Sequence, residues 1–548
     1  KTMKGHIISH AWQSLWNVHR KAKQILFFMI RPTHQTNTKK HSPDNNSGSQ
    51  KTHHFYTKRQ WTGLILGPLL FVVTLMFFQP EGLSKEALAV LASTLWIATW
   101  WVTEAIPIPA AALLPIILFP MTGAVDSKTT TSAYADDVIF LFMGGFIIAL
   151  AIERWNLHKR IALAIISAIG TSTERIILGF MIATGLLSMW ISNTATAMMM
   201  VPIGLAIIYQ FMDALEKEGQ TVHRDNFPFG KSLMLGIGYS ASVGGVATLI
   251  GTPPNTIFVG VVRELFDVNI SFASWMLFGV PLSVVLIAFI WVYLIKFAFP
   301  MPFKNIPGGR EVIHQEKAKL GHMTYEEKAV LTIFVITAFA WISRTFILEK
   351  FVPINDTTIA IIASLILFIV PSINKKGSNL MNWETAKNLP WGILLLFGGG
   401  LAIAAGFNNS GLAEWIGSQL TIVSNVPVLW IIITVTTLVL FLTEITSNTA
   451  TATMMFPIMA SLAFASNVHP YGLMIAAGVA ASCAFMLPVA TPPNAVVFGS
   501  GYIKIGDMIK AGFWINIFSI FLITFAIYYL LPLVWGIDLT QFPDTFIK

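Results

Sequence analysis

The sequence predicts an all-α polytopic membrane protein, and three observations support this class. Hydrophobic residues make up 55% of the 548 residues and charged residues only 11%, whereas soluble domains contain about 25% charged residues. Apolar segments long enough to span a bilayer follow one another from about residue 62 to about residue 536. Three polar motifs within these segments occur twice in the same order, which indicates an internal duplication.

Composition and motifs also exclude several classes of protein. The low charge excludes a single soluble globule, and the high hydrophobicity excludes intrinsic disorder. The one cysteine, Cys483, excludes a disulfide scaffold and a cysteine-based metal site. The sequence has no H-E-x-x-H, no phosphate-binding loop and no nucleophile elbow, so we do not expect an enzyme.

The N-terminal segment carries the positive charge of the chain. Residues 1–60 contain 11 Lys and Arg residues against one acidic residue, whereas the whole chain has a net charge of +8. Because the excess of basic residues is confined to this arm, we expect no binding to nucleic acid. The arm is expected in the cytoplasm, either as an amphipathic helix on anionic membrane lipid or as a tail without fixed structure.

Charged loops predict which side of the membrane each segment faces. Lys and Arg gather at 154–175, 304–328 and 375–376, while acidic residues dominate 126–137. Under the positive-inside rule, this pattern places the N-terminus in the cytoplasm and the C-terminus outside. The predicted organisation is a basic cytoplasmic arm at 1–60, a first half at 61–298 with a hairpin at 176–212, a cytoplasmic linker at 299–328, and a second half at 329–540 with a hairpin at 428–466.

The duplicated motifs divide the chain into two halves. Five crossings separate the two Ser-Asn-Thr motifs, or seven if the hairpin arms also cross, and both numbers are odd. The halves are therefore expected to face opposite ways, and such inverted repeats with polar breaks at matching positions are typical of secondary transporters. The paired motifs are Phe142–Phe146 with Phe397–Leu401, Ser192–Ala197 with Ser447–Ala452, and Thr252–Asn255 with Thr491–Asn494.

The two Ser-Asn-Thr-Ala-Thr motifs lie between apolar arms. Glu444 is the only charged residue in the arms 176–191, 195–209, 428–446 and 450–466. A surface turn is normally marked by charge, Gly or Pro, so each motif is predicted to be the tip of a hairpin that enters the membrane and turns back. Helix ends at such a tip present N–H groups to an anion and C=O groups to a cation. The alternative is that Ser and Thr only cap or pack helices, which two identical copies make less attractive.

The two Thr-Pro-Pro-Asn motifs each interrupt a long apolar segment. Proline lacks an N–H group and breaks the helix, so the carbonyl oxygens at 250–252 and 489–491 are expected to lack partners. Such carbonyls can bind a hard cation such as sodium. A simple helix kink is the alternative interpretation.

Fixed positive charge is missing around all of these motifs. No Lys or Arg lies at 176–216, 232–262 or 388–503. A bound anion therefore has to be balanced by hydroxyls, amides, backbone dipoles and mobile cations. Moving one charge across 100 mV is worth about 2.3 kcal/mol, so two sodium ions neutralise a dianion and a third makes its uptake electrically driven. Proton coupling is not expected, because Glu444 has only Met189 at the corresponding position of the first half.

Several stretches match a known family. They are Trp101–Pro109, both Ser-Asn-Thr motifs and Ser482–Val497, within a match over about residues 60–540. On these residues the chain resembles the divalent anion:sodium symporters, which carry dicarboxylates, citrate and sulfate. The resemblance implies a homodimer whose subunits have an inverted repeat with eleven transmembrane helices plus two re-entrant hairpins, and an elevator-type mechanism. It also implies a multi-pass protein of the plasma membrane, which is the inner membrane in a Gram-negative cell.

The resemblance further implies a site and an activity. The expected activity is sodium-coupled uptake of a small dianion, such as the C4-dicarboxylate succinate, with two or more sodium ions. Sodium-independent dicarboxylate exchange and an anion channel are the alternatives, and the sequence does not choose among succinate, malate, citrate and sulfate. The implied residues are Ser188, Ser192, Asn193 and Gly251 for the first sodium site, Thr443, Thr446, Asn448 and Ala490 for the second, and Asn193, Thr194, Asn448, Thr449, Thr252, Thr491 and Pro492 for the substrate.

Overall fold

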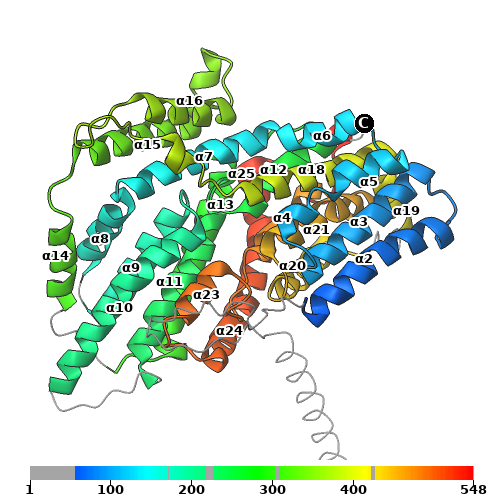
Figure 1. The fold of residues 1–548 in the computed structure, drawn as a ribbon. Helices are drawn as coiled ribbons and strands as arrows, with labels where there is room; N and C mark the ends of the chain where they lie inside the picture. Colours follow the sequence, from blue (N-terminus) through cyan, green and yellow to red (C-terminus); the bar gives the residue numbers. More distant parts are fainter. Residues whose placement is uncertain (1–55, 171, 218–225, 303–308, 421–425, 547–548) are drawn as a thin grey trace, which may run out of the picture. The chain divides into compact units, whose positions relative to one another are not determined.

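The computed structural model of the chain describes residues 56–170, 172–217, 226–302, 309–420 and 426–546. Apart from its last five residues, the predicted basic arm at 1–60 lies outside the described residues. Helices form nearly all of the described chain (Figure 1), and the strand-like pairing found there is one isolated bridge between Pro371 and Asn379.

The helices before residue 300 are α2 (Lys58–Phe77), α3 (Lys85–Thr103), α4 (Ile108–Ala111), α5 (Leu114–Thr122), α6 (Ser127–Ser132), α7 (Asp137–Arg154), α8 (Leu157–Ile169), α9 (Thr173–Ser188), α10 (Asn193–Lys217), α11 (Pro228–Val246), α12 (Pro253–Phe266) and α13 (Phe272–Tyr293). The later helices are α14 (Gly309–Lys319), α15 (Tyr325–Ser343), α16 (Asp356–Ile369), α17 (Trp383–Ala386), α18 (Trp391–Ser410), α19 (Leu412–Gln419), α20 (Val428–Thr443), α21 (Asn448–Ala465), α22 (Pro470–Ala481), α23 (Pro492–Phe498), α24 (Ile505–Phe525) and α25 (Leu531–Trp535).

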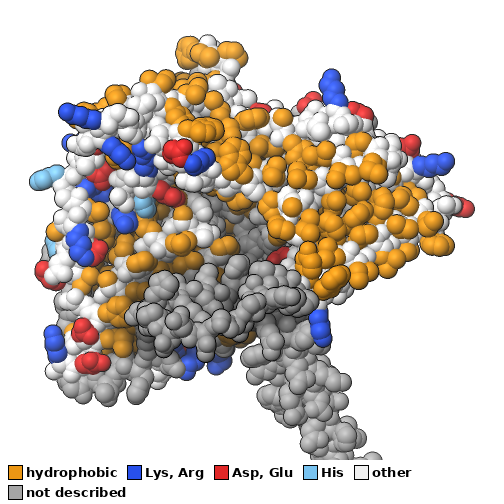
Figure 2. All heavy atoms as spheres, viewed as in Figure 1, with side chains coloured by type: hydrophobic (Ala, Val, Ile, Leu, Met, Phe, Trp, Pro, Cys, Tyr) orange, Lys and Arg blue, Asp and Glu red, His pale blue; other side chains and the backbone are white. Residues whose placement is uncertain are grey.

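Many of these helices are suited to a lipid environment. Within the described residues, seven helical stretches are long and apolar enough to cross a membrane, and four shorter apolar helices accompany them. Figure 2 shows a wide hydrophobic area on the right of the view, where α2 and α3 lie, and on α2 the side chains of Ile65, Leu69 and Met76 are exposed. The predicted all-α class with many apolar spans is therefore confirmed for the described part of the chain.

Each Ser-Asn-Thr motif starts a helix directly after another helix has ended. In the first half α9 ends at Ser188 and α10 begins at Asn193. In the second half α20 ends at Thr443 and α21 begins at Asn448. The spacing of five residues is the same in both halves, so matching side chains occupy matching positions at the two turns. The first pair of helices extends to Lys217, beyond the predicted end of the hairpin at residue 212.

Each Thr-Pro-Pro-Asn motif lies where one helix has ended and a new one opens. The prolines Pro253 and Pro492 are the first residues of α12 and α23, where the missing N–H group of proline costs no helical hydrogen bond. The long helices α13 and α24 each place a glycine against the backbone of a break, where no side chain would fit. A Cβ atom on Gly279 of α13 would lie 2.8 Å from the Val246 carbonyl oxygen, and one on Gly512 of α24 would lie 2.2 Å from the Phe485 carbonyl oxygen.

The apolar stretch Ile108–Thr122 is divided into the two short helices α4 and α5. Three prolines explain the division. Pro107 and Pro109 stand at the start of α4, and Pro115 stands at the start of α5. Proline favours the first turn of a helix, so a closely spaced set favours two short helices over one long one.

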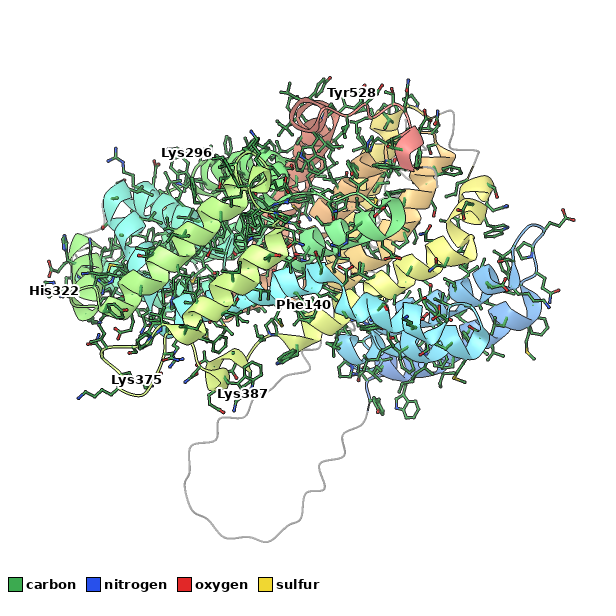
Figure 3. The ribbon with its side chains drawn as sticks, turned by 90° about the horizontal axis from the view of Figure 1, so that it is seen from above. Phe140, Lys296, His322, Lys375, Lys387 and Tyr528 are labelled. Atoms are coloured by element: carbon green, nitrogen blue, oxygen red, sulfur yellow. The ribbon has the colours of Figure 1, made fainter. Side chains whose placement is uncertain are left out.

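One end of α7 gathers loops that are rich in basic residues. Arg154 donates to the Ser378 hydroxyl at 2.8 Å, and Arg160 lies 2.8 Å from the Glu327 carboxylate at the start of α15. Figure 3 shows Lys375 and Lys387 extending away from the ribbon, and both are exposed. The loops that were predicted to share one side of the membrane therefore lie together, although which side this is stays a prediction.

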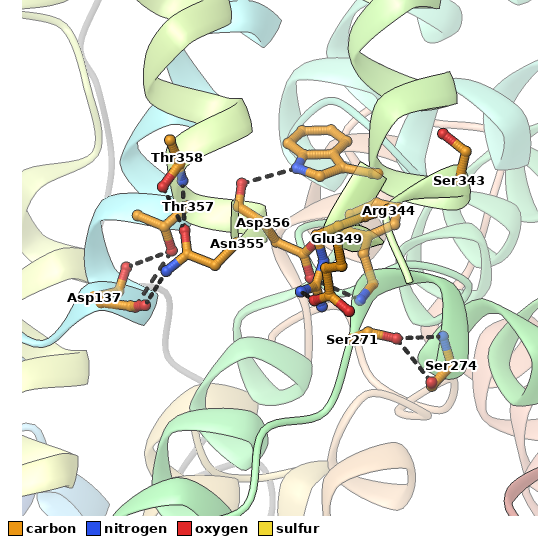
Figure 4. A network of polar contacts seen from close by, with 12 residues as sticks. Asp137, Ser271, Ser274, Ser343, Arg344, Glu349, Asn355, Asp356, Thr357 and Thr358 are labelled. Atoms are coloured by element: carbon orange, nitrogen blue, oxygen red, sulfur yellow. Dashed lines mark hydrogen bonds and ion pairs between the residues drawn. The ribbon is translucent and has the colours of Figure 1, made fainter. Parts of the chain in front are cut away.

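The other end of α7 carries acidic residues in a polar network. Asp136 and Asp137 pair with Arg263 at the end of α12. Close by in Figure 4, Arg344 of the α15–α16 connection lies 2.7 Å from the Asp356 carboxylate, which is buried. These ion pairs join the end of α12 to the start of α7, and the end of α15 to the start of α16.

Candidate functional site

The first Ser-Asn-Thr turn gathers oxygen atoms with too few hydrogens between them. The Ser188 hydroxyl lies 2.5 Å from the Asn193 amide oxygen and 2.6 Å from the Ala241 carbonyl oxygen, but it has only one hydrogen to donate. The same end of the Asn193 amide also lies 3.1 Å from the Ala241 carbonyl oxygen and 3.2 Å from that of Gly251. Either the amide turns its NH2 group inward, or a positive ion lies among these oxygens.

The second turn repeats this arrangement. The Thr443 hydroxyl donates toward the Asn448 amide oxygen at 2.7 Å and toward the Ala481 carbonyl oxygen at 3.0 Å. Again one hydrogen is shared by two acceptors. Ser188 and Thr443 are fully buried, so bulk water does not reach their hydroxyl groups. Neutral hydroxyl, amide and carbonyl oxygens are ligands of the type that hard cations prefer.

Glycine makes the first of these clusters possible. A Cβ atom on Gly245 would lie 2.7 Å from the Asn193 amide oxygen and 2.9 Å from the Gly251 carbonyl oxygen. A Cβ atom on Gly251 would lie 2.4 Å from the Gly245 carbonyl oxygen. The backbone on both sides of the first break therefore approaches the hairpin turn more closely than any other residue type permits.

The asparagines of the Thr-Pro-Pro-Asn motifs brace the two breaks. The Asn255 amide donates to the carbonyl oxygens of Gly245, Val246 and Thr248, at 3.4, 3.1 and 2.7 Å. The Asn494 amide does the same in the second half, to the carbonyl oxygens of Ala484 at 2.9 Å and Leu487 at 3.1 Å. Each motif therefore closes its own break by bonding back to the preceding segment.

The expectation that all carbonyls at 250–252 and 489–491 lack partners is wrong. The Thr252 carbonyl oxygen accepts from the Asn255 N–H at 3.2 Å, and the Thr491 carbonyl oxygen accepts from the Ala495 N–H at 3.1 Å. Both bonds belong to the first turn of the helix that follows, which satisfies its capping residue. The Gly251 carbonyl oxygen faces the side chain of Asn193 instead of a backbone N–H group, as expected for a broken helix.

The same two turns supply N–H groups for an anion. The first N–H groups of a helix have no partner within that helix, and the helix dipole makes this end positive. In α10 these groups belong to Asn193 and Thr194, and in α21 to Asn448 and Thr449. All four residues are half-buried, so they are reachable from outside while remaining shielded from bulk water.

The remaining predicted residues are placed less uniformly. Ser192 precedes α10, and its carbonyl oxygen accepts from the Thr196 N–H at 2.9 Å. The Thr446 hydroxyl donates to the Leu442 carbonyl oxygen at 2.8 Å and pairs with Thr451, so any cation contact of Thr446 has to come from its backbone. Thr252, Thr491 and Ala490 are buried at the two breaks, while Pro492 is exposed.

Several residues of the site were not predicted. The carbonyls of Ala241 and Ala481 have no sequence signature, because any residue type supplies a backbone oxygen. Glu444 was noted only as an isolated charge. Its carboxylate accepts from the N–H groups of Phe485, Met486 and Leu487, at 2.9 to 3.2 Å, and from the Asn516 amide at 2.7 Å. Among the described residues no group of three His, Cys, Asp or Glu side chains could hold a metal ion.

Helices from the two halves of the chain pack together around the breaks. Phe258 of α12 lies against Phe456 of α21, with ring centroids 5.9 Å apart. Gly238 of α11 packs against Val497 of α23, where a Cβ atom would lie 2.8 Å from the valine side chain. The helices that carry the first break are therefore direct neighbours of those that carry the second turn and the second break.

Comparisons with known proteins agree with this architecture. The family model described as the sodium:sulfate symporter transmembrane region matches residues 58–536. A sodium-dependent dicarboxylate transporter, SdcS, of Staphylococcus saprophyticus is 52% identical over 497 residues, which cover 90% of this chain and 95% of that protein. The protein of the same name from a Staphylococcus aureus strain is 52% identical over 499 residues, with the same coverage of 90% and 95%.

Two solved structures share the fold at low sequence identity. MtrF of Neisseria gonorrhoeae aligns with a TM-score of 0.55 and 12% identity, over 88% of this chain and 96% of that one. The YdaH transporter of Alcanivorax borkumensis aligns with a TM-score of 0.51 and 12% identity, over 83% of this chain and 98% of that one. The family model and the relatives together confirm the resemblance that the motifs indicated: this chain belongs to the sodium:sulfate symporter family, the divalent anion:sodium symporters.

Proposed function

We propose that this protein takes up a small C4-dicarboxylate such as succinate together with sodium ions. The observation that carries the proposal is the pair of matching polar clusters at Ser188–Asn193 and Thr443–Asn448, where a hydroxyl, an asparagine amide and a backbone carbonyl meet at each hairpin turn. A sodium ion in each cluster supplies the positive charge that the side chains lack. The relatives named sodium-dependent dicarboxylate transporters support the choice of both ion and substrate class.

Each residue then has a stated role. In the first sodium site Ser188, Ser192, Asn193 and Gly251 supply oxygen ligands, and we add the Ala241 carbonyl. In the second site Thr443, Thr446, Asn448 and Ala490 do so, and we add the Ala481 carbonyl. The two substrate carboxylates bind at the helix starts formed by Asn193 and Thr194 and by Asn448 and Thr449, with Thr252, Thr491 and Pro492 beside them.

The charge balance explains why the ions are needed. No Lys or Arg occurs at 176–216, 232–262 or 388–503, which contain both turns and both breaks. A dianion crossing alone into a negative interior costs about 4.6 kcal/mol at 100 mV. Two sodium ions cancel this cost, and a third makes uptake electrically favourable. Because the ions complete the anion site, sodium has to bind for the dicarboxylate to bind tightly.

The finer architecture follows from the same proposal. The two turns are re-entrant hairpins of an inverted repeat with eleven transmembrane helices, and the hairpins and broken helices move as an elevator against the remaining helices. Two copies form a homodimer in the plasma membrane. The basic arm lies in the cytoplasm and the C-terminus outside.

Uptake into proteoliposomes tests the proposal. Labelled succinate should accumulate when an inward sodium gradient is imposed, and replacing sodium by choline should abolish uptake. Citrate and sulfate serve as competitors that define the anion class. Succinate counterflow that persists without sodium would identify an exchanger instead, and a flux that does not saturate with succinate concentration would identify a channel.

A further inference from the structure

The backbone of Phe485, at the second break, is held from both halves of the chain. Its N–H group donates to the Glu444 carboxylate at 2.9 Å. Its carbonyl oxygen accepts from the Tyr239 hydroxyl of α11, in the first half, at 2.8 Å. The two aromatic rings also meet edge to face, with centroids 5.2 Å apart. Tyr239 is fully buried, so no water competes for this hydroxyl–carbonyl bond.

On one side, Tyr239 leads to the first sodium site. It lies two residues before Ala241, whose carbonyl oxygen accepts from the Ser188 hydroxyl at 2.6 Å. Backbone hydrogen bonds link successive turns of an α-helix, and the residues of α11 from Phe229 to Val246 are buried. The Ala241 carbonyl and the Tyr239 side chain therefore belong to one packed element, along which a displacement at the ion site could pass.

On the other side, Phe485 leads to the second sodium site. The Glu444 carboxylate that binds the Phe485 N–H also binds the N–H groups of Met486 and Leu487. Glu444 directly follows Thr443, whose hydroxyl bonds to Asn448 at 2.7 Å. The position of the second break therefore sets the position of the turn that holds the second ion.

The hydrogen bond from Tyr239 to Phe485 is not repeated by a residue of the second half bonding to the first half. The offset of 239 residues that relates the two Thr-Pro-Pro-Asn motifs places Gly478 at the position of Tyr239, and glycine has no hydroxyl to donate. The same offset relates Phe485 to Val246, whose carbonyl oxygen accepts from the Trp275 indole at 2.9 Å, within its own half. A single hydroxyl thus bridges the halves at this crossing point.

We infer that Tyr239 is a positioning residue that couples the two sodium sites, so that an ion in one site raises the affinity of the other. This inference rests on the proposed function, because it requires both oxygen clusters to bind sodium. Coupling between sites in proteins typically changes affinity 5- to 150-fold. Tyr239 touches neither ion nor substrate, and acts through Phe485 and Glu444.

Sodium binding to the purified, substrate-free full chain tests this coupling. Titration calorimetry at constant ionic strength, with choline replacing sodium, gives a binding curve that is cooperative only if the sites help one another. The wild type should give a Hill coefficient above 1, and Tyr239→Phe should lower it to about 1. Tyr134→Phe is the matched control, because it also removes a hydroxyl that bonds to a backbone carbonyl, that of Ala112 at 2.5 Å, and it should keep the wild-type curve.

The outcomes distinguish failure of the coupling through Tyr239 from failure of the proposed sodium transport. Cooperative binding that survives in Tyr239→Phe, or independent binding in the wild type, overturns the coupling while leaving sodium transport intact. A wild type that binds no sodium at all overturns the proposed function itself. If Tyr239→Phe does not yield folded protein, Glu444→Ala removes both acceptor oxygens and interrupts the same path at its next contact, and unchanged cooperativity in that variant overturns the inference.

Discussion

The Thr443 hydroxyl lies 2.7 Å from the amide oxygen of Asn448, five residues further along the chain. The first half repeats this relationship between Ser188 and Asn193 at 2.5 Å. In both places the hydroxyl also approaches a backbone carbonyl of the neighbouring broken helix, Ala481 or Ala241. In the proposed function, a sodium ion at each place would join the hairpin turn to the broken helix and would form part of the substrate site.

Removing either asparagine amide should stop transport without unfolding the protein. Asn448→Ala and Asn193→Ala each delete an oxygen that serves the ion and a group at the substrate site. A hydrogen bond to a charged group contributes about 1.5–3 kcal/mol, so uptake should fall at least about tenfold in each variant. Initial rates of succinate uptake measure this. Asn409→Ala, which removes an exposed asparagine from α18, should transport normally. Near-normal uptake in both site variants contradicts the assignment.

Gly245→Ala should weaken the first sodium site selectively. Its new Cβ atom would lie 2.7 Å from the Asn193 amide oxygen, which forces the ligand out of place. The sodium concentration for half-maximal uptake should rise several-fold in the protein that reaches the membrane. Gly506→Ala is the control, because nothing lies within 4 Å of a Cβ atom there. An unchanged sodium dependence in Gly245→Ala would mean that Asn193 is not a ligand.

Glu444→Ala should destabilise the protein. The N–H groups of Phe485, Met486 and Leu487 would lose their common acceptor in a buried place. Each unsatisfied buried donor costs about 1–3 kcal/mol, so the loss should reach about 3 kcal/mol or more. Thermal unfolding of the purified protein measures the effect. Glu444→Gln keeps one acceptor oxygen and should lose less, and Glu414→Ala, at an exposed site, should lose almost nothing. Equal midpoints for all three variants would refute the bracing role.

Arg344 should stabilise the protein mainly because its positive charge compensates the buried Asp356 carboxylate. Arg344 pairs with the buried Asp356 carboxylate and with Glu349. Arg344→Met leaves a buried carboxylate uncompensated, which typically costs 3–5 kcal/mol. The double variant Arg344→Met/Asp356→Asn removes both charges, keeps an acceptor for the Phe272 N–H, and should recover much of this loss in a thermal unfolding experiment. A double variant that is less stable than the single one would show that the pair contributes more than mutual neutralisation.

Local sequence signals were sufficient to predict the helical class, the family and the places where helices end. Repeated Ser-Asn-Thr and Thr-Pro-Pro motifs mark turns because their residues favour helix starts. The carbonyls of Thr252 and Thr491 were misjudged because the first turn of the next helix binds them. Whether the turns re-enter the membrane as hairpins stays a prediction.

The long-range contacts of the site could not be predicted from the sequence. The Tyr239 hydroxyl bonds to a carbonyl 246 residues away, and no local pattern of either residue announces this contact. The Ala241 and Ala481 carbonyls contribute through backbone oxygens, which are independent of residue type. Glu444 looked like an isolated charge in an apolar arm because its partners are backbone N–H groups exposed only when the second broken helix unwinds.

The central claim is that sodium completes the two oxygen clusters, and sodium-dependent stabilisation tests it most directly. Binding to the folded state alone stabilises a protein by about 2.7 kcal/mol per site when the ligand is at 100 times its Kd. The unfolding midpoint of the substrate-free protein should therefore rise with sodium at constant ionic strength, and rise less in Asn193→Ala and Asn448→Ala. Identical midpoints in sodium and in choline would contradict the account.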